Sequence, residues 1–346
     1  MLRQKITYSE RQEQCMRCDI NSVLCNIQSM ELKSETPIIF PNQLETAKQI
    51  YNNFQDRTVI NQYVAGKCQS GKTGLILAVI KLFLENYQIP PNNIYLLSSL
   101  SSVEWNRQNK DRMPIFIKDN VFHRNELKNK FADAVRDKQN VLIILDELHI
   151  ASQEEQLLSK LFEELHLLDK EFLLENDIKL IEISATPDST IYDLKEWNEH
   201  HRIIKFEPSD NYIGAKQLMN NHQIKEFKPL CFDEKATKQV KDEVYNNIFE
   251  FLSTVKQYDN PKYHIIRTHT GIKSEETNNN IEYVFKTINF TDYEILKHDL
   301  HVSNNINAIL KNKPLNHTFI FIKERLRAAI TLDTVSYTHL TLPTKA

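Results

Sequence analysis

The sequence predicts an α/β protein whose first part is a parallel sheet carrying a phosphate-binding loop. Three observations predict it: a glycine-rich loop between an apolar strand and an apolar helix, a buried strand that ends in two acids, and a further alternation of helices and strands toward the C-terminus. In parallel sheets, ligands bind at the carboxyl ends of the strands. The motifs are therefore expected to meet at one edge of the sheet.

The composition is that of a chain with enough apolar residues for about two domains. It has 346 residues, 41% of them hydrophobic, and a formal net charge of −3, so it lacks the strong positive charge of many nucleic-acid-binding proteins. Five cysteines without a leader sequence predict an intracellular, cytoplasmic location. No apolar run reaches the roughly 18 residues of a membrane span, so no membrane contact is expected.

Residues 1–36 are expected to form a helical N-terminal extension. It contains Cys15, Cys18 and Cys25. A C-x-x-C pair is half of a common zinc site, but a second pair at suitable spacing is missing. Metal binding by these cysteines stays open, and free thiols on a helix are the favoured interpretation.

Phe40 and Gln43 stand at the start of a helix that is expected to run to about residue 54. Pro41 suits the first turn of such a helix. The Gln43 amide suits the edge of an adenine, and the Phe40 ring suits stacking on the base. An ordinary surface glutamine at a helix start is the alternative.

The phosphate-binding loop is the strongest motif. Only five glycines occur in the chain, and three of them, Gly66, Gly71 and Gly74, lie within nine positions. Glycine lets the backbone take positive φ and bring its N–H groups to phosphate oxygens, while the next helix points its positive end at them. Lys72 is expected to reach the β- and γ-phosphates of ATP, and Thr73 to bind Mg²⁺. The residues that match G-x-x-x-x-G-K-S/T are Gly66, Lys67, Cys68, Gln69, Ser70, Gly71, Lys72 and Thr73.

A strand over residues 94–97 is expected next, followed by a serine-rich turn. The hydroxyl of Ser98 and the guanidinium of Arg112 suit contacts with nucleic-acid phosphates, and Trp105 suits stacking on a base. A capped helix with a buried tryptophan is the alternative. A weak strand is expected over residues 115–117.

The second strong motif follows a strand of five apolar residues, 141–145, which predicts burial on both faces. Asp146 is expected to hold Mg²⁺, and Glu147 to orient and deprotonate the attacking water. His149 completes the motif.

A helical stretch is expected over residues 153–175 and a strand over residues 178–183. Because Lys179 and Glu182 interrupt the apolar run of this strand, it is expected to be less buried than the preceding one. It ends in Ser184 and Thr186, whose hydroxyls suit hydrogen bonds toward the acidic motif.

Together these motifs resemble those of the superfamily-two helicases and translocases, over about residues 37–190. Residues 66–73 are similar to the first motif of the family, residues 146–149 to its DExH box and residues 184–186 to its third motif. Phe40 and Gln43 resemble its adenine-reading element. The resemblance implies a RecA-like ATP-binding domain over residues 37–206, in which Ser184, Thr186 and His149 couple hydrolysis to nucleic acid.

The second half is expected to form a partial second RecA-like domain over residues 207–334. Arg325 and Arg327 fall where the fifth motif of the family is expected and suit phosphate contacts, with surface cations as the alternative. The sixth motif, whose arginines reach the γ-phosphate, is not found. Helices are expected over about residues 235–256, 274–285 and 305–310, and strands over residues 264–269 and 318–322.

Residues 335–346 resemble the translation of an adapter end used in sequencing libraries, and they are expected to be a non-native tail. The chain is then a C-terminally truncated fragment. Because the missing arginine contributes about 10³ to 10⁵ in rate, such a fragment is expected to bind ATP but to hydrolyse it weakly.

The resemblance implies an ATP- and Mg²⁺-dependent helicase or translocase that moves on DNA or RNA, with a single strand in the cleft between two lobes. The pattern around Trp105 and His123 is more like that of phage and giant-virus ATPases, so a virus factory is a further expected location. Two alternatives stay open: a motor subunit of a restriction or packaging system, and a P-loop ATPase switch that acts on a protein partner.

Overall fold

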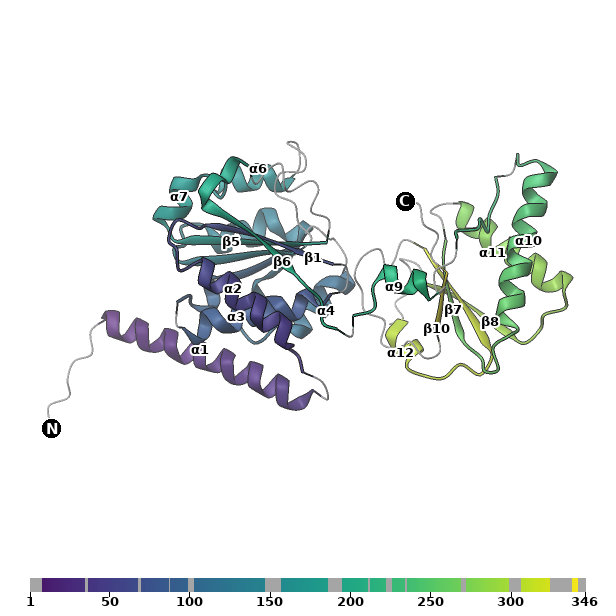
Figure 1. Ribbon diagram of the computed structural model, residues 1–346, viewed down its shortest axis with the longest axis horizontal. Coiled ribbons are helices and arrows are strands. Elements are labelled where there is room, and N and C mark those ends of the chain that lie inside the picture. The colour runs from purple at the N-terminus through teal and green to yellow at the C-terminus, as the bar shows by residue number, and fades with distance from the viewer. Residues whose placement is uncertain are drawn as a thin grey trace. The chain divides into compact units, whose positions relative to one another are not determined.

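The chain folds into two compact units, Met1–Tyr212 and Ile213–Ala346, each with helices around a sheet (Figure 1). The predicted domain boundaries at residues 36, 206 and 334 stay predictions. The computed structural model describes residues 8–34, 37–67, 70–86, 88–98, 103–146, 157–185, 195–210, 212–221, 226–233, 235–268, 272–298, 306–323 and 338–341.

Unit 1 is built on a six-stranded parallel sheet of order β3-β2-β4-β5-β1-β6. This order places β5 between β4, which ends in Asp146, and β1, which leads into the phosphate-binding loop. The prediction of an α/β fold with a parallel sheet is confirmed, and the assignment of this sheet to a RecA-like domain stays a prediction. The strands are β1 (Asn61–Gly66), β2 (Ile94–Ser98), β3 (Val121–His123), β4 (Val141–Asp146), β5 (Ile178–Ser184) and β6 (His201–Phe206).

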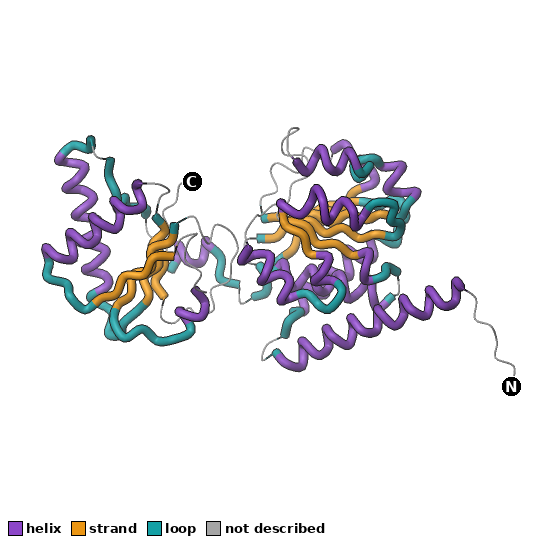
Figure 2. The backbone as a smooth tube through the Cα atoms, turned by 180° about the vertical axis from the view of Figure 1, so that it is seen from behind, coloured by secondary structure: helices purple, strands orange, loops and turns teal. Residues whose placement is uncertain are grey.

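Helices cover both faces of this sheet, so the sheet is the middle layer of unit 1 (Figure 2). One core packs α1, α2 and α3 on one face, and a second core packs α6, α7 and the short helices around residue 131 on the other. The helices are α1 (Tyr8–Lys33), α2 (Pro41–Asn53), α3 (Lys72–Glu85), α4 (Val103–Arg112), α5 (Ala132–Val135), α6 (Leu157–Glu164) and α7 (Lys170–Glu175), with short turns η1 (Pro91–Asn93), η2 (Ile117–Asn120), η3 (Arg124–Glu126), η4 (Leu127–Phe131) and η6 (Lys195–His200).

Helix α1 belongs to the core of unit 1. Ile20, Val23 and Ile27 recur on one side of the helix and are fully buried against α3. Glu31 pairs with Lys81 of α3 at 3.6 Å. The predicted extension therefore braces the helix that follows the phosphate-binding loop. None of the described helices is long and apolar enough to cross a membrane.

Two local expectations are corrected by the structure, and one strand was missed. The weak strand over residues 115–117 is wrong: Phe116 has φ of 67°, Ile117 is buried at the start of a 3-10 turn, and the strand begins at Val121. The helical stretch over residues 153–175 is interrupted after residue 164, because Asp169 accepts a hydrogen bond from the Phe172 N–H and begins a new helix. Strand β6 was not predicted.

Strand β5 is as buried as β4 at its centre, so the expectation of a more exposed strand is wrong for Glu182. Its side chain is 3% exposed, and the Asn61 Nδ2 donates to its Oε1 at 2.9 Å. Asn61 is itself fully buried on the neighbouring strand. A buried carboxylate is tolerated when donors of this kind satisfy it.

Unit 2 is built on a smaller parallel sheet of order β10-β7-β9-β8, and its assignment to a partial second RecA-like domain stays a prediction. Helices α10 and α11 pack on one face and α12 on the other. β10 lies within the predicted non-native tail, and that prediction stays a prediction. The elements are β7 (Tyr263–Arg267), β8 (Tyr293–His298), β9 (His317–Ile322), β10 (Thr338–Thr341), α9 (Ala215–Asn220), α10 (Lys238–Val255), α11 (Ile272–Thr287) and α12 (Ile306–Leu310).

Two histidines form a hydrogen-bonded pair at the start of β7 and β9. His264 is fully buried, and its Nε2 lies 2.9 Å from His317 Nδ1. The Lys262 N–H also donates to His317 Nδ1, at 3.4 Å. His317 Nδ1 is therefore the acceptor and His264 Nε2 the donor. Burial, and next the Lys262 cation, lower the pKa of His317.

We expect unit 2 to lose stability as the pH falls below about 6.5. His317 binds a proton more readily in the unfolded chain than in the folded one, so the stabilisation is present above that pH and is lost toward the lower folded pKa. Hydrogen exchange of β7 at a series of pH values measures this loss. His317→Gln keeps an acceptor that does not titrate, and it should remove most of the pH dependence; an equal slope in the variant would contradict the assignment.

We expect Asn61→Leu to lower the free energy of unfolding of unit 1 by about 1–3 kcal/mol, because a buried carboxylate loses one of its donors. Both tryptophans, Trp105 and Trp197, lie in unit 1, so tryptophan fluorescence in urea reports this unit. Asn125→Leu, the same change at an exposed position, is the control and should stay within about 0.5 kcal/mol. Equal effects of the two changes would argue against the buried contact.

Candidate nucleotide-binding site

The phosphate-binding loop joins the end of β1 to the start of α3. Gly71 immediately precedes the helix with φ of 91° and ψ of 27°, a left-handed conformation that other residues adopt only at a cost. The Gly71 carbonyl accepts from the N–H groups of Gly74 and Leu75, so the helix begins directly after it. The first N–H groups of α3 have no partner within the helix, which is the usual arrangement for binding an anion.

Gln43 supports this loop from α2. It is 4% exposed, its Nε2 donates to the Gly71 carbonyl at 2.9 Å, and its Oε1 accepts from the Phe40 N–H at 2.7 Å. A Cβ on Gly71 or on Gly74 would collide with the Gln43 amide. Gln43 is thus not a surface residue but a link between the start of α2 and the loop. Contact of Gln43 or Phe40 with adenine stays a prediction.

The remaining loop residues leave polar groups that fit a phosphate ligand. The Ser70 side chain is 7% exposed, and its hydroxyl has no hydrogen-bond partner among the described residues. Lys72 and Thr73 are half-buried at the helix start, and Lys67 is exposed. An orphaned buried hydroxyl beside a helix N-terminus fits a group that brings acceptor oxygens, such as a nucleotide phosphate chain.

The parallel register brings the other predicted residues to the same edge of the sheet. Ser184 pairs with Ala65 on one side, and Ile183 pairs with Asp146 on the other. Ser98, at the end of β2, is the register partner of Asp146 at the end of β4. Strands lie about 4.8 Å apart, so the end of β5 separates Asp146 from the phosphate-binding loop by about 10 Å.

The structure describes only part of the predicted site. Asp146 is half-buried and Ser184 is buried at the ends of their strands. Ser98 is fully buried, whereas Arg112 is exposed at the end of α4. Trp105 lies in α4, and nothing is described of its side chain. The predicted residues outside the described part of the chain are Cys68, Gln69, Glu147, His149, Thr186, Arg325 and Arg327.

The predicted cysteines lie on the surface of α1. Cys15, Cys18 and Cys25 are exposed free thiols. Among the described residues, no three His, Cys, Asp or Glu side chains are grouped to hold a metal ion.

The sequence analysis missed the residues that follow β6 and lie beside the phosphate-binding loop. The Asn42 Nδ2 donates to the Glu207 carbonyl at 2.9 Å, and the Lys67 ammonium lies 6.0 Å from the centre of the Tyr212 ring. The Lys205 hydrogen bond, together with the charges of Lys205 and Lys67, outweighs desolvation and lowers the pKa of Glu207. No motif marks these positions; only the unpredicted pairing of β6 with β1 brings them together.

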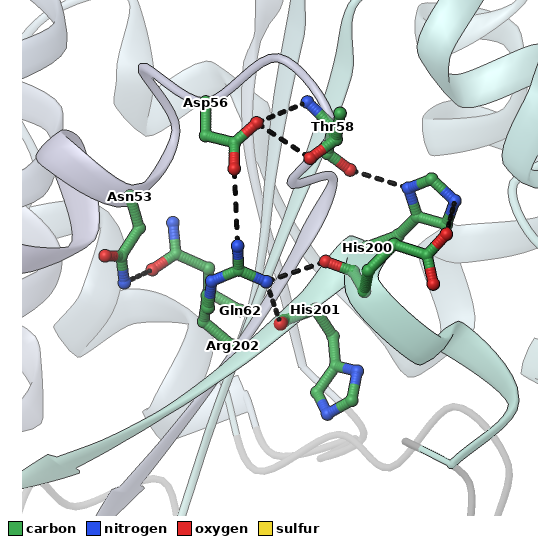
Figure 3. Close-up of polar contacts among 8 residues, drawn as sticks. Asn53, Asp56, Thr58, Gln62, His200, His201 and Arg202 are labelled. Carbon is green, nitrogen blue, oxygen red and sulfur yellow. Dashed lines mark hydrogen bonds and ion pairs between the residues drawn. The ribbon is translucent and has the colours of Figure 1, made fainter.

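The carboxyl-terminal end of α2 is fixed near the amino-terminal ends of β1 and β6 (Figure 3). The Gln62 Nε2 donates to the Ile50 carbonyl at 2.8 Å, and its Oε1 accepts from Asn53 at 2.9 Å. Arg202 at the start of β6 pairs with Asp56 at 3.3 Å. Helix α2 is therefore held at both ends, with Gln43 at the nucleotide side.

Comparison with known proteins gives a distant viral relative. No protein-family model matches the chain. An uncharacterized protein of Acanthamoeba polyphaga mimivirus is 29% identical over 316 residues, which are 85% of this chain and 74% of that protein. S. cerevisiae Dbp5 bound to RNA and ADP BeF3 aligns over 82% of this chain and 74% of its own, with a TM-score of 0.42 and 13% identity. A variant of Dbp5 with the same ligands gives 0.38 and 12%.

We expect Gln43→Ala to weaken the binding of both ATP and inorganic pyrophosphate by about tenfold or more, because the hydrogen bond that holds Gly71 in place is lost. Titration calorimetry measures the dissociation constants of ATP and of pyrophosphate. Gly74→Ala disturbs the same contact from the loop side and should act alike. If Gln43→Ala weakened ATP but left pyrophosphate unchanged, Gln43 would be an adenine reader and not a support of the loop.

Proposed function

We propose that unit 1 binds and hydrolyses Mg²⁺–ATP and that the chain is a helicase or translocase acting on DNA or RNA. The observation that carries this proposal is the alignment of a phosphate-binding loop, a buried serine and an acid at the ends of β1, β5 and β4. Catalytic and binding groups of open α/β sheets gather at this edge. The Ser70 hydroxyl, which is buried and has no hydrogen-bond partner among the described residues, adds support, because a phosphate oxygen would satisfy it.

In this proposal the loop binds the phosphate chain. The first N–H groups of α3 and the Ser70 hydroxyl donate to phosphate oxygens, and Lys72 neutralises charge on the β- and γ-phosphates. Thr73 and Asp146 hold Mg²⁺, which supplies further neutralisation of the phosphate charge. Gln43 keeps the loop in place, and the Phe40 ring, which is 41% exposed, is proposed to stack on the adenine.

Hydrolysis is assigned to Glu147, which follows Asp146 at the end of β4. Its carboxylate accepts a proton from the water that attacks the γ-phosphorus, the bond to the β-phosphate oxygen breaks, and ADP and phosphate leave. Ser184 lies between Asp146 and the loop, so Ser184, Thr186 and His149 are proposed to report the state of the phosphates to the nucleic-acid side.

The nucleic-acid strand is assigned to the edge beyond Asp146, where β2 and β3 end. Arg112 is exposed and Lys110 is half-buried in the last turn of α4, and both suit phosphate contacts. Trp105 on the same helix is proposed to stack on a base. Arg325 and Arg327, which lie outside the described residues, are proposed to contact nucleic-acid phosphates. Ser98 is buried, so its part in binding requires this strand end to open.

We expect Lys72→Ala and Asp146→Asn to abolish ATP turnover, and Glu147→Gln to lower kcat by about 10²- to 10⁴-fold while ATP still binds. Steady-state ATPase assays with and without single-stranded DNA or RNA, and ATP binding by calorimetry, measure these effects. Asp133→Asn, a change at an exposed acid, is the control. An unchanged kcat in Glu147→Gln would refute the assignment of the base. An ATP turnover rate that no DNA or RNA alters would favour the ATPase switch.

A further inference from the structure

The chain that leaves the sheet of unit 1 after β6 starts beside the phosphate-binding loop. β6 pairs in parallel with β1, and Gly66 is the register partner of Phe206. Lys67 and Glu207 are the next residues on these two strands, so they leave the sheet side by side. Packing supports the contact: a Cβ on Gly66 would lie 3.0 Å from the Phe206 ring.

Lys67 is held by groups of this exit segment, by which we mean residues 207–210 and 212. Its ammonium lies 6.0 Å from the centre of the half-buried Tyr212 ring, within the range of a cation–π contact. The Glu207 carboxylate also feels the charge of Lys67. The Tyr212 N–H donates to the Ser209 carbonyl at 2.9 Å, so the ring is presented by a turn.

The same segment is attached to the helix that supports the loop. Asn42 donates to the Glu207 carbonyl, and the next residue, Gln43, donates to the Gly71 carbonyl. The exit segment is therefore linked to the loop and its supporting helix through the Glu207 carbonyl, which accepts from Asn42, and through the exposed cation of Lys67. Only the second contact involves a group that a phosphate chain would attract.

We propose that Tyr212 and Glu207 are positioning residues that compete with nucleotide phosphates for Lys67, so that nucleotide binding releases the exit segment. The proposal rests on the nucleotide binding proposed above. A triphosphate attracts an exposed ammonium over a Debye length of about 8–10 Å, whereas a tyrosine ring attracts it only at contact. The phosphates therefore draw Lys67 away, and Tyr212 loses a restraint.

Competition for Lys67 and support of the site predict opposite changes in phosphate affinity when the Tyr212 ring is removed. Coupling is reciprocal, so a group that loses its contact when the nucleotide binds weakens that binding. Removing the Tyr212 ring should therefore tighten phosphate binding. A ring that stacked on the base, or merely packed the site, would weaken binding when removed.

The test measures the affinity for inorganic pyrophosphate and for ATP, both with Mg²⁺, in the full chain. Tyr212→Leu should tighten both by about two- to fivefold, the factor that corresponds to an exposed cation–π contact. Glu207→Gln keeps the main-chain carbonyl that Asn42 binds, and it should tighten both by a few-fold, less at high salt. In a Lys67→Met background neither change should have an effect, which a double-mutant cycle shows.

Hydrogen exchange provides the second measurement. Mg²⁺ with a non-hydrolysable ATP analogue should speed exchange in the exit segment several-fold in the natural chain and leave it unchanged in Lys67→Met. Tyr283→Leu, at a tyrosine 55% exposed in unit 2, is the control and should alter neither readout. A chain that binds neither ATP nor pyrophosphate overturns both proposals. A chain that binds them, with weaker or unchanged binding in Tyr212→Leu, overturns only this one.

Discussion

Parallel pairing is the constraint on which the site of unit 1 depends. Because all six strands run in one direction, every strand ends at the same edge, and the pairing register decides which residues meet there. A shift of one residue in β5 would move Ser184 away from its place between Asp146 and the phosphate-binding loop, and would turn Glu182 out of the core. The hydrogen bond between Asn61 and Glu182 opposes that shift, since both side chains are buried and this hydrogen bond forms only in this register.

Helix α2 connects the sheet to the phosphate-binding loop through hydrogen bonds at both of its ends. Its carboxyl end is fastened to β1 through Gln62, and its amino end holds the Gly71 carbonyl through Gln43. A helix fixed at both ends positions its polar groups more exactly than a loop does, because its own backbone hydrogen bonds limit its motion. The glycines then have a second purpose besides backbone freedom: at Gly71 and Gly74 there is no space for a side chain next to the Gln43 amide.

The elements with strong local signals could be predicted from the sequence, and those that depend on distant partners could not. The run of five apolar residues before Asp146 predicts a buried strand on its own. Glu182 was misjudged because its donor, Asn61, lies 121 residues earlier. Gln43 carries a helix-start signal, but its burial follows from its contact with Gly71, 28 residues away. Glu207 and Tyr212 carry no signal, because only the pairing of β6 with β1 brings them to Lys67.

The position of the exit segment follows from the strand order alone. Since β6 is the neighbour of β1, the chain must leave the sheet about 4.8 Å from the phosphate-binding loop, whatever its sequence. The side chains decide whether that closeness has an effect. An apolar residue at position 67 would leave the segment indifferent to the ligand, whereas a lysine shared by a carboxylate and an aromatic ring makes the segment sensitive to any added negative charge. A contact of this strength shifts an equilibrium only a few-fold, so it tunes the response of the segment to nucleotide and does not act as an all-or-none switch.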